Sequence, residues 1–79
     1  MITGSQIRAA RALVRWSAGE LAEKVGSARQ TIMRFEQVDS VPPSRTQTLM
    51  EIKRVFEGAG LEFIGTPDNG PGVRFRPNT

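Results

Sequence analysis

Two helix-boundary signals stand close together in the stretch SAGELAEKVG and constrain the fold of this chain more than any other feature. Ser17 and Glu20 form an S-x-x-E capping box, in which each residue satisfies a backbone N–H group that a helix start leaves free. Gly26 suits the left-handed conformation that ends many helices, because it has no Cβ to clash. The stretch therefore predicts a short helix that ends at about Val25 and is followed by a tight turn.

The next segment, from about Ala28 to Gln37, predicts a second short helix with two unlike faces. At about 100° per residue, one face forms a core-facing stripe that includes Ile32 and Phe35. The opposite face carries long, mostly polar side chains: Arg29, Gln30, Met33, Arg34 and Gln37. The helix start stays open, since Ser27 with Gln30 makes a capping box, whereas a start at Ala28 would leave the cap position poorly filled.

Further elements are predicted on both sides of this helix pair. Before it, a Thr3 capping box opens a helix that runs to Val14, with apolar residues at helical spacing. After it, Ser44 with Gln47 offers a cap for a fourth helix that closes near Ala59. Two short strand-like runs follow around the turn-rich stretch TPDNGPG: Leu61–Gly65 and Val73–Arg76. This connection is longer than a two-residue turn, so pairing within one chain and pairing across two chains both stay open.

The composition limits how such a chain can be stabilised and what chemistry it can do. A domain of 79 residues buries only about 60–65% of the surface that its unfolded chain exposes, so its core is marginal. The absence of Cys and His removes disulfides, thiolate metal sites and the commonest general base. Oligomerisation is the supplement that remains. The acidic residues show no paired-carboxylate or metal-ligand spacing, so we expect no enzyme activity, metal or cofactor.

The charge and the hydropathy point to a soluble chain with a basic first half. The net charge is +3, with a pI near 10.6, and six of the basic residues lie before Glu36. A polyanionic partner would explain this bias, although an ordinary solvated surface has a similar composition. No apolar run approaches the roughly 18–20 residues of a membrane span, and the start lacks a signal-peptide hydrophobic stretch. We therefore expect a cytoplasmic protein.

Two short helices joined by a tight turn are the layout of a helix-turn-helix unit, although an ordinary helical hairpin has the same spacing. The stretch LAEKVGSARQTIMRFE, together with Arg11, resembles the XRE family of Cro/cI-like helix-turn-helix repressors over Thr3 to Ala59. The resemblance implies a mainly α, lambda-repressor-like bundle of about four short helices in residues 1–60. The tail LEFIGTPDNGPGVRFR is similar to the C-terminal β extension of some small bacterial members. That extension would span residues 61–79, as a β-hairpin or strand pair with a short flexible end.

The resemblance also implies roles for the second helix of the unit, which contacts base edges in the major groove. Four exposed residues, here called the outward row, match base-contacting positions: Arg29, Gln30, Met33 and Arg34. The chemistry agrees, because Arg suits guanine O6 and N7, Gln suits adenine N6 and N7, and an apolar side chain suits the thymine methyl group. In the family, Arg11 and Glu36 form a largely buried ion pair that links the first helix to this one.

Phosphate contacts are expected where free N–H groups and the helix dipole face the DNA backbone. The candidates are Ser17 and Ala18 at one helix start, Ser44 and Arg45 at another, Thr31, and Arg15. The chain departs from the family pattern at Ala18, where many members have a Gln that contacts a phosphate. It departs again at Val38, where a Gly is usual.

The expected function is that of a sequence-specific transcriptional regulator, a repressor, which binds double-stranded DNA as a homodimer. The C-terminal segment is either the dimer contact or a cap on the core, through Leu61, Phe63, Ile64, Val73 and Phe75. One alternative is an antitoxin that represses its own operon and binds a toxin, which a neighbouring toxin gene would indicate. Another is a protein–protein interaction module on the same scaffold.

Overall fold

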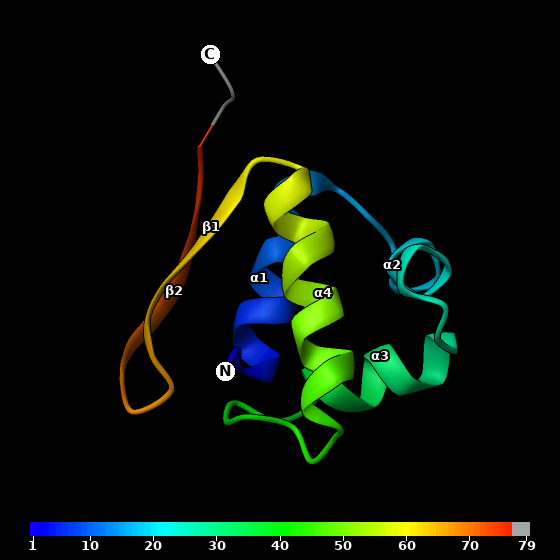
Figure 1. The fold of residues 1–79 in the computed structure, drawn as a ribbon, viewed down its shortest axis with the longest axis horizontal. Helices are drawn as coiled ribbons and strands as arrows, with labels where there is room; N and C mark the ends of the chain where they lie inside the picture. The colour runs from blue at the N-terminus through cyan, green and yellow to red at the C-terminus, as the bar shows by residue number, and fades with distance from the viewer. Residues whose placement is uncertain (77–79) are drawn as a thin grey trace.

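The computed structural model describes residues 1–76, which form four helices followed by one antiparallel β-hairpin (Figure 1). The chain is therefore mainly α with a C-terminal hairpin, as predicted. The expected flexible end falls on residues 77–79, outside the described residues. No helix in residues 1–76 has the length and apolar character needed to cross a membrane. The elements are α1 (Gly4–Val14), α2 (Ala18–Val25), α3 (Arg29–Glu36), α4 (Thr46–Gly58), β1 (Leu61–Thr66) and β2 (Asn69–Phe75).

The elements surround one apolar core in a closed ring of contacts. Helix α1 contacts α3, α3 contacts α2, and α2 contacts α4; α4 then contacts β1, and β2 returns to α1. Figure 1 shows the hairpin on one side of α1 and α4, with α2 and α3 on the other. The buried apolar residues come from every helix and from β1: Ile2, Ile7, Ala10, Ala18, Leu21, Ala22, Ile32, Phe35, Leu49, Ile52, Phe56 and Leu61.

The two predicted capping boxes are confirmed at the starts of α1 and α2. Thr3 accepts a hydrogen bond from the Gln6 N–H, and Ser17 accepts one from the Glu20 N–H. The reciprocal hydrogen bond from the Ser17 N–H holds the pKa of the Glu20 carboxyl below its usual value. The cap is therefore complete above the unfolded-state pKa of that carboxyl and is lost as the pH falls through the lowered value.

Of the two starts left open for α3, the structure has the one at Ala28, whereas the start of α4 differs from the predicted cap. The N-cap residues are Ala28 and Arg45, and within residues 1–76 neither helix has a side-chain hydrogen bond at its N-cap. The Ser27–Gln30 box is therefore absent, and the Ser44–Gln47 cap is wrong. Packing of the apolar side of each helix on the core outweighs a local cap here. Ile32 of α3 and Leu49 and Ile52 of α4 are all buried.

The hairpin closes within one chain and is longer than predicted. Thr66 pairs with Asn69, so the turn consists of the two residues Pro67 and Asp68, and the expectation of a longer connection was wrong. Strand β2 begins four residues before Val73, where its glycine-rich sequence has no strand-like alternation. Gly65, with φ 76°, lies at a register shift in β1. A side chain there would be strained and would overlap the Gly70 backbone.

One face of the hairpin completes the core. Leu61 is only 3% exposed, and the ring of Phe63 meets that of Phe56 edge-on at 6.0 Å between centroids. Trp16 also stacks on the ring of Phe56, at 5.4 Å between centroids. Val73 is half-buried against the same cluster, whereas Ile64 and Phe75 are exposed. Three of the five residues proposed for a cap or a dimer contact thus cap the core of their own chain.

The side chain of Gln6 ties the hairpin to the start of α1. Its Oε1 accepts a hydrogen bond from the Thr3 N–H at 2.8 Å. Its Nε2 donates to two strand carbonyls, that of Ile64 at 3.2 Å and that of Gly72 at 2.9 Å. Because Gln6 is buried, water cannot easily replace these hydrogen bonds, so losing one leaves a polar group unpaired at a cost in free energy of unfolding. A single amide therefore caps a helix with one end and holds both strands with the other.

Replacing Gln6 by glutamate should loosen the hairpin. A carboxylate keeps the oxygen that caps α1, but it cannot donate to two carbonyl oxygens and would repel both. We expect a loss of about 1–3 kcal/mol in the free energy of unfolding, measured by urea denaturation followed by circular dichroism. Asn69→Asp makes the same chemical change at an exposed position and should leave stability nearly unchanged. Equal effects of the two substitutions would contradict the role of Gln6.

Candidate functional site

The turn between α2 and α3 fixes how the two helices meet. Gly26 ends α2 in the left-handed conformation, with φ 68°. The Ser27 N–H donates to the Ala22 carbonyl at 2.8 Å, which completes a Schellman motif. Helix α3 starts two residues later and buries Ile32 and Phe35 in the core. Its orientation relative to α2 is thus fixed by the turn and by the packing of those two side chains.

The outward row lies on the exposed side of α3. Arg29, Gln30, Met33 and Arg34 are all exposed, although Met33 is a large apolar side chain and is 45% exposed. Two of the four, Arg29 and Met33, also line a groove beside the helix.

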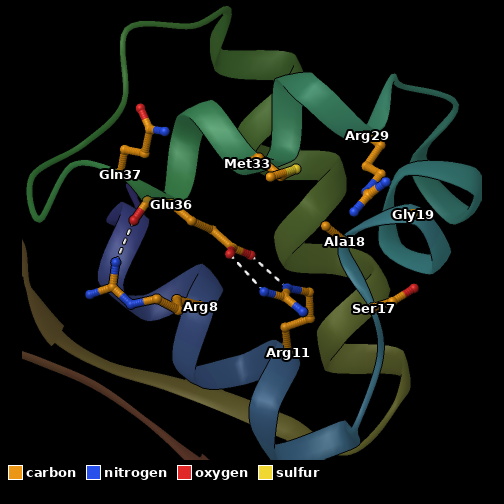
Figure 2. Close-up of a pocket in the computed structure, with 9 residues that line it drawn as sticks. All are labelled: Arg8, Arg11, Ser17, Ala18, Gly19, Arg29, Met33, Glu36 and Gln37. Atoms are coloured by element: carbon orange, nitrogen blue, oxygen red, sulfur yellow. Dashed lines mark hydrogen bonds and ion pairs between the residues drawn. The ribbon is translucent and has the colours of Figure 1, made fainter.

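This groove has a volume of about 660 Å³ and lies between α1, the start of α2 and α3 (Figure 2). Three arginines and one glutamate supply its charges, so the groove is positive overall. The first turn of α2 forms one wall, and the site where a Cβ on Gly19 would stand is 3.9 Å from Arg29 Cδ. The lining residues are Arg8, Arg11, Ser17, Ala18, Gly19, Arg29, Met33, Glu36 and Gln37.

The ion pair expected between Arg11 and Glu36 is present at the floor of the groove. Arg11 Nε donates to Glu36 Oε2 at 2.7 Å and Arg11 Nη2 donates to Oε1 at 2.8 Å, so the pair is bidentate. The third donor, Nη1, reaches the Trp16 carbonyl at 2.9 Å. The side chains are 25% and 9% exposed. The hydrogen bond to Glu36 raises the pKa of Arg11, which keeps this guanidinium charged.

The predicted phosphate-contacting residues fall into two places. Ser17 and Ala18 stand at the start of α2, where the Ser17 hydroxyl already accepts the capping hydrogen bond at 3.0 Å. Arg45 stands at the start of α4 and lines a second groove together with Lys24. Ser44 is exposed just before it, and Thr31 is half-buried on α3. Arg15 is exposed at the end of α1 in a left-handed conformation, with φ 60°.

Sequence reasoning missed two residues of α1 that contact the C-terminal end of α3. Gly4 donates its N–H to the Ser40 carbonyl at 3.0 Å, and a Cβ on it would overlap the carbonyl oxygens of Phe35 and Val38. Arg8 donates to the Glu36 carbonyl. Gly4, Arg8 and Arg11 lie at offsets of four and seven, so they share one face of α1. This spacing is the feature of the sequence from which their common face could have been predicted.

The exposed side of α3 and the adjacent groove together form a basic surface that includes the large apolar side chain of Met33. Glu36 is the acidic residue of the groove, and its charge is matched by Arg11. Such a surface suits an extended anionic partner more than a neutral one. Comparison with models of known protein families gives no match for this chain, and comparison with curated proteins finds no match either.

Proposed function

We propose that the protein is a DNA-binding transcriptional regulator of the XRE, Cro/cI-like type. In this proposal α2 and α3 are a helix-turn-helix unit, and the protein acts as a homodimeric repressor. The observation that carries it is the division of α3 into a fully buried side and the outward row, which holds two arginines, a glutamine and a methionine. A helix of that kind fits the width of a major groove, where those side chains match base edges.

In this proposal, the phosphates of the DNA backbone bind at the grooves beside the starts of α2 and α4. A helix start leaves N–H groups without intrahelical partners, and Arg29 lines the groove at the start of α2 while Arg45 lines that at the start of α4. Phosphate groups bind at such positions because the N–H groups and the helix dipole both favour negative charge. Phosphate contacts at both places would hold α3 in register on the duplex.

A homodimer is proposed because one short helix contacts only a few base pairs. Two copies related by a twofold axis contact half-sites about 34 Å apart, which supplies the missing specificity. Ile64 and Phe75, on the hairpin, are large apolar residues left exposed. They are the residues of the C-terminal segment that remain free to contact a second copy.

Selection of binding sites from random duplex DNA with the purified protein tests the proposal directly. A regulator should enrich one sequence, and a dimer should enrich a sequence with twofold symmetry. Its affinity should also fall steeply as the salt concentration rises, since bound phosphates release counterions. A protein–protein interaction module would enrich no site and would show no steep salt dependence.

Gln30→Ala should lose specificity at a single base pair. Removal of a bidentate amide contact should cost about 1–3 kcal/mol of binding to the selected site and relax the preference at one position. Competition binding against each single-base variant of that site measures both effects. Arg45→Ala is the matched comparison, because loss of a phosphate contact should weaken binding to all sequences alike and lower the salt slope by about one. An unchanged sequence profile for Gln30→Ala would remove Gln30 from the base contacts.

A further inference from the structure

The C-terminal end of α3 is held by another helix rather than by its own cap. Helices α1 and α2 end in left-handed residues, but Gln37 at the end of α3 keeps a right-handed conformation, with φ −77°. Its last turn closes with long hydrogen bonds, from Gln37 to the Arg34 carbonyl at 3.3 Å and from Val38 to the Phe35 carbonyl at 3.4 Å. The Glu36 carbonyl therefore lies at a weakly closed end, where helices leave acceptors free.

Arg8 supplies the donor that this helix end needs. Its Nη1 donates to the Glu36 carbonyl, and its Nη2 lies 3.3 Å from Asp39 Oδ1 in the following loop. One guanidinium thus spans the last residue of α3 and the chain that leaves it (Figure 2 shows the Glu36 contact). A positive charge at this place also complements the negative end of the helix dipole. The loop is held further by Ser5 Oγ, which donates to the Asp39 carbonyl at 3.2 Å.

Glu36 is consequently held at two separate points by one face of α1. Arg11 holds its carboxylate and Arg8 holds its main chain. The turn and the packing of Ile32 and Phe35 set how α3 meets α2. Arg8 and Arg11 add two contacts at its far end, which limit how far that end can tilt. Because α3 has eight residues, it is about 12 Å long, so a tilt of about 10° at Glu36 would move Arg29 by about 2 Å.

We propose that Arg8 is a positioning residue that sets the direction in which α3 presents the outward row. The inference rests on the proposed function, since the row is the surface that would contact bases. Base contacts need side chains placed to within about 0.5 Å, which a movement of that size would defeat. Contacts to phosphates tolerate it better, because they depend mainly on charge. Arg8 should therefore matter more for binding the selected sequence than for binding DNA in general.

The test compares Arg8→Ala and Arg8→Lys on the selected duplex and on an unrelated duplex of equal length. Arg8→Ala should lower affinity for the selected duplex by about tenfold, a loss comparable to one mismatched base pair, with a much smaller change on the unrelated duplex. Arg8→Lys keeps the charge but offers no planar fork, so it should restore only part of the loss. Asp39→Ala removes the exposed ion pair and spares the Glu36 bond, so it should behave like the wild type.

Two results would overturn the inference while the proposed function stands. One is an equal loss on both duplexes that lysine fully restores, which would make Arg8 a simple phosphate contact. The other is an Arg8→Ala variant whose free form shows unchanged amide NMR signals along α3, since a released helix end should shift them from Gln37 back to Arg29. A wild-type protein that selects no DNA site would instead overturn the proposed function, and the amide signals would then decide whether Arg8 positions α3.

Discussion

Gly4→Ala should destabilise the protein by about 3 kcal/mol or more, because it forces a buried methyl group against two main-chain oxygens. The carbonyls of Phe35 and Val38 lie where the new Cβ would stand, and neither can move without moving the end of α3. The Gly4 N–H bond to the Ser40 carbonyl would be displaced as well. For a domain of this size, the expected fall in melting temperature is about 12–24 °C, measurable by circular dichroism.

Gly58→Ala is the matched control for that experiment. Gly58 is the last residue of α4, and among the described residues no atom lies within 4 Å of the Cβ that it would gain. Alanine is the better helix former by up to about 1 kcal/mol, so this variant should melt at or above the wild-type temperature. A Gly4→Ala protein with the same melting temperature as the wild type would show that α1 and α3 approach each other less closely than in this structure.

Arg11→Ala should have the second large effect, a loss of about 3–5 kcal/mol in the free energy of unfolding. The substitution leaves the Glu36 carboxylate, whose side chain is 9% exposed, without its partner. It also removes the donor to the Trp16 carbonyl. Chemical denaturation measures the loss, and the proposed binding of DNA should fall with it, because Glu36 is one of the residues by which α1 holds α3.

A double-mutant cycle separates the cost of the stranded charge from the value of the pair. Arg11→Ala with Glu36→Ala should cost less than the sum of the two single substitutions, since the double variant leaves no buried charge unpaired. Arg11→Lys should fall between wild type and alanine, because an ammonium lacks the planar fork that makes the bidentate contact. A melting temperature for Arg11→Ala within a few degrees of wild type would contradict a structural role for the pair.

The parts of the fold that were predictable from sequence depend on local chemistry. The starts of α1 and α2 follow from Thr3 and Ser17, and the end of α2 follows from Gly26, because each signal acts within a few residues. The starts of α3 and α4 were not predictable in this way. There the packing of Ile32 and Leu49 on the core outweighs the local caps at Ser27 and Ser44.

The contacts of the candidate site needed more than local chemistry. The Arg11–Glu36 pair was expected from a family resemblance, since nothing within either helix indicates the other. The role of Arg8 depends on where the end of α3 lies in space, which the sequence alone does not reveal. The two-residue turn of the hairpin was hidden for a different reason. Gly70 and Gly72 give the first part of β2, before Val73, too little strand propensity to be recognised, so the strand seemed to start later than it does.

The closed ring of contacts has a consequence for how the chain comes apart. Every element has a neighbour on each side, and β1 and β2 join α4 to α1. If the hairpin detaches, Phe56 loses the ring of Phe63 and the Gln6 amide loses both strand carbonyls at once. We therefore expect residues 1–60 alone to be less stable than the full chain, even though they hold every residue proposed to contact DNA. The stability of the proposed DNA-contacting surface thus depends on the hairpin, although the hairpin contributes no residue to that surface.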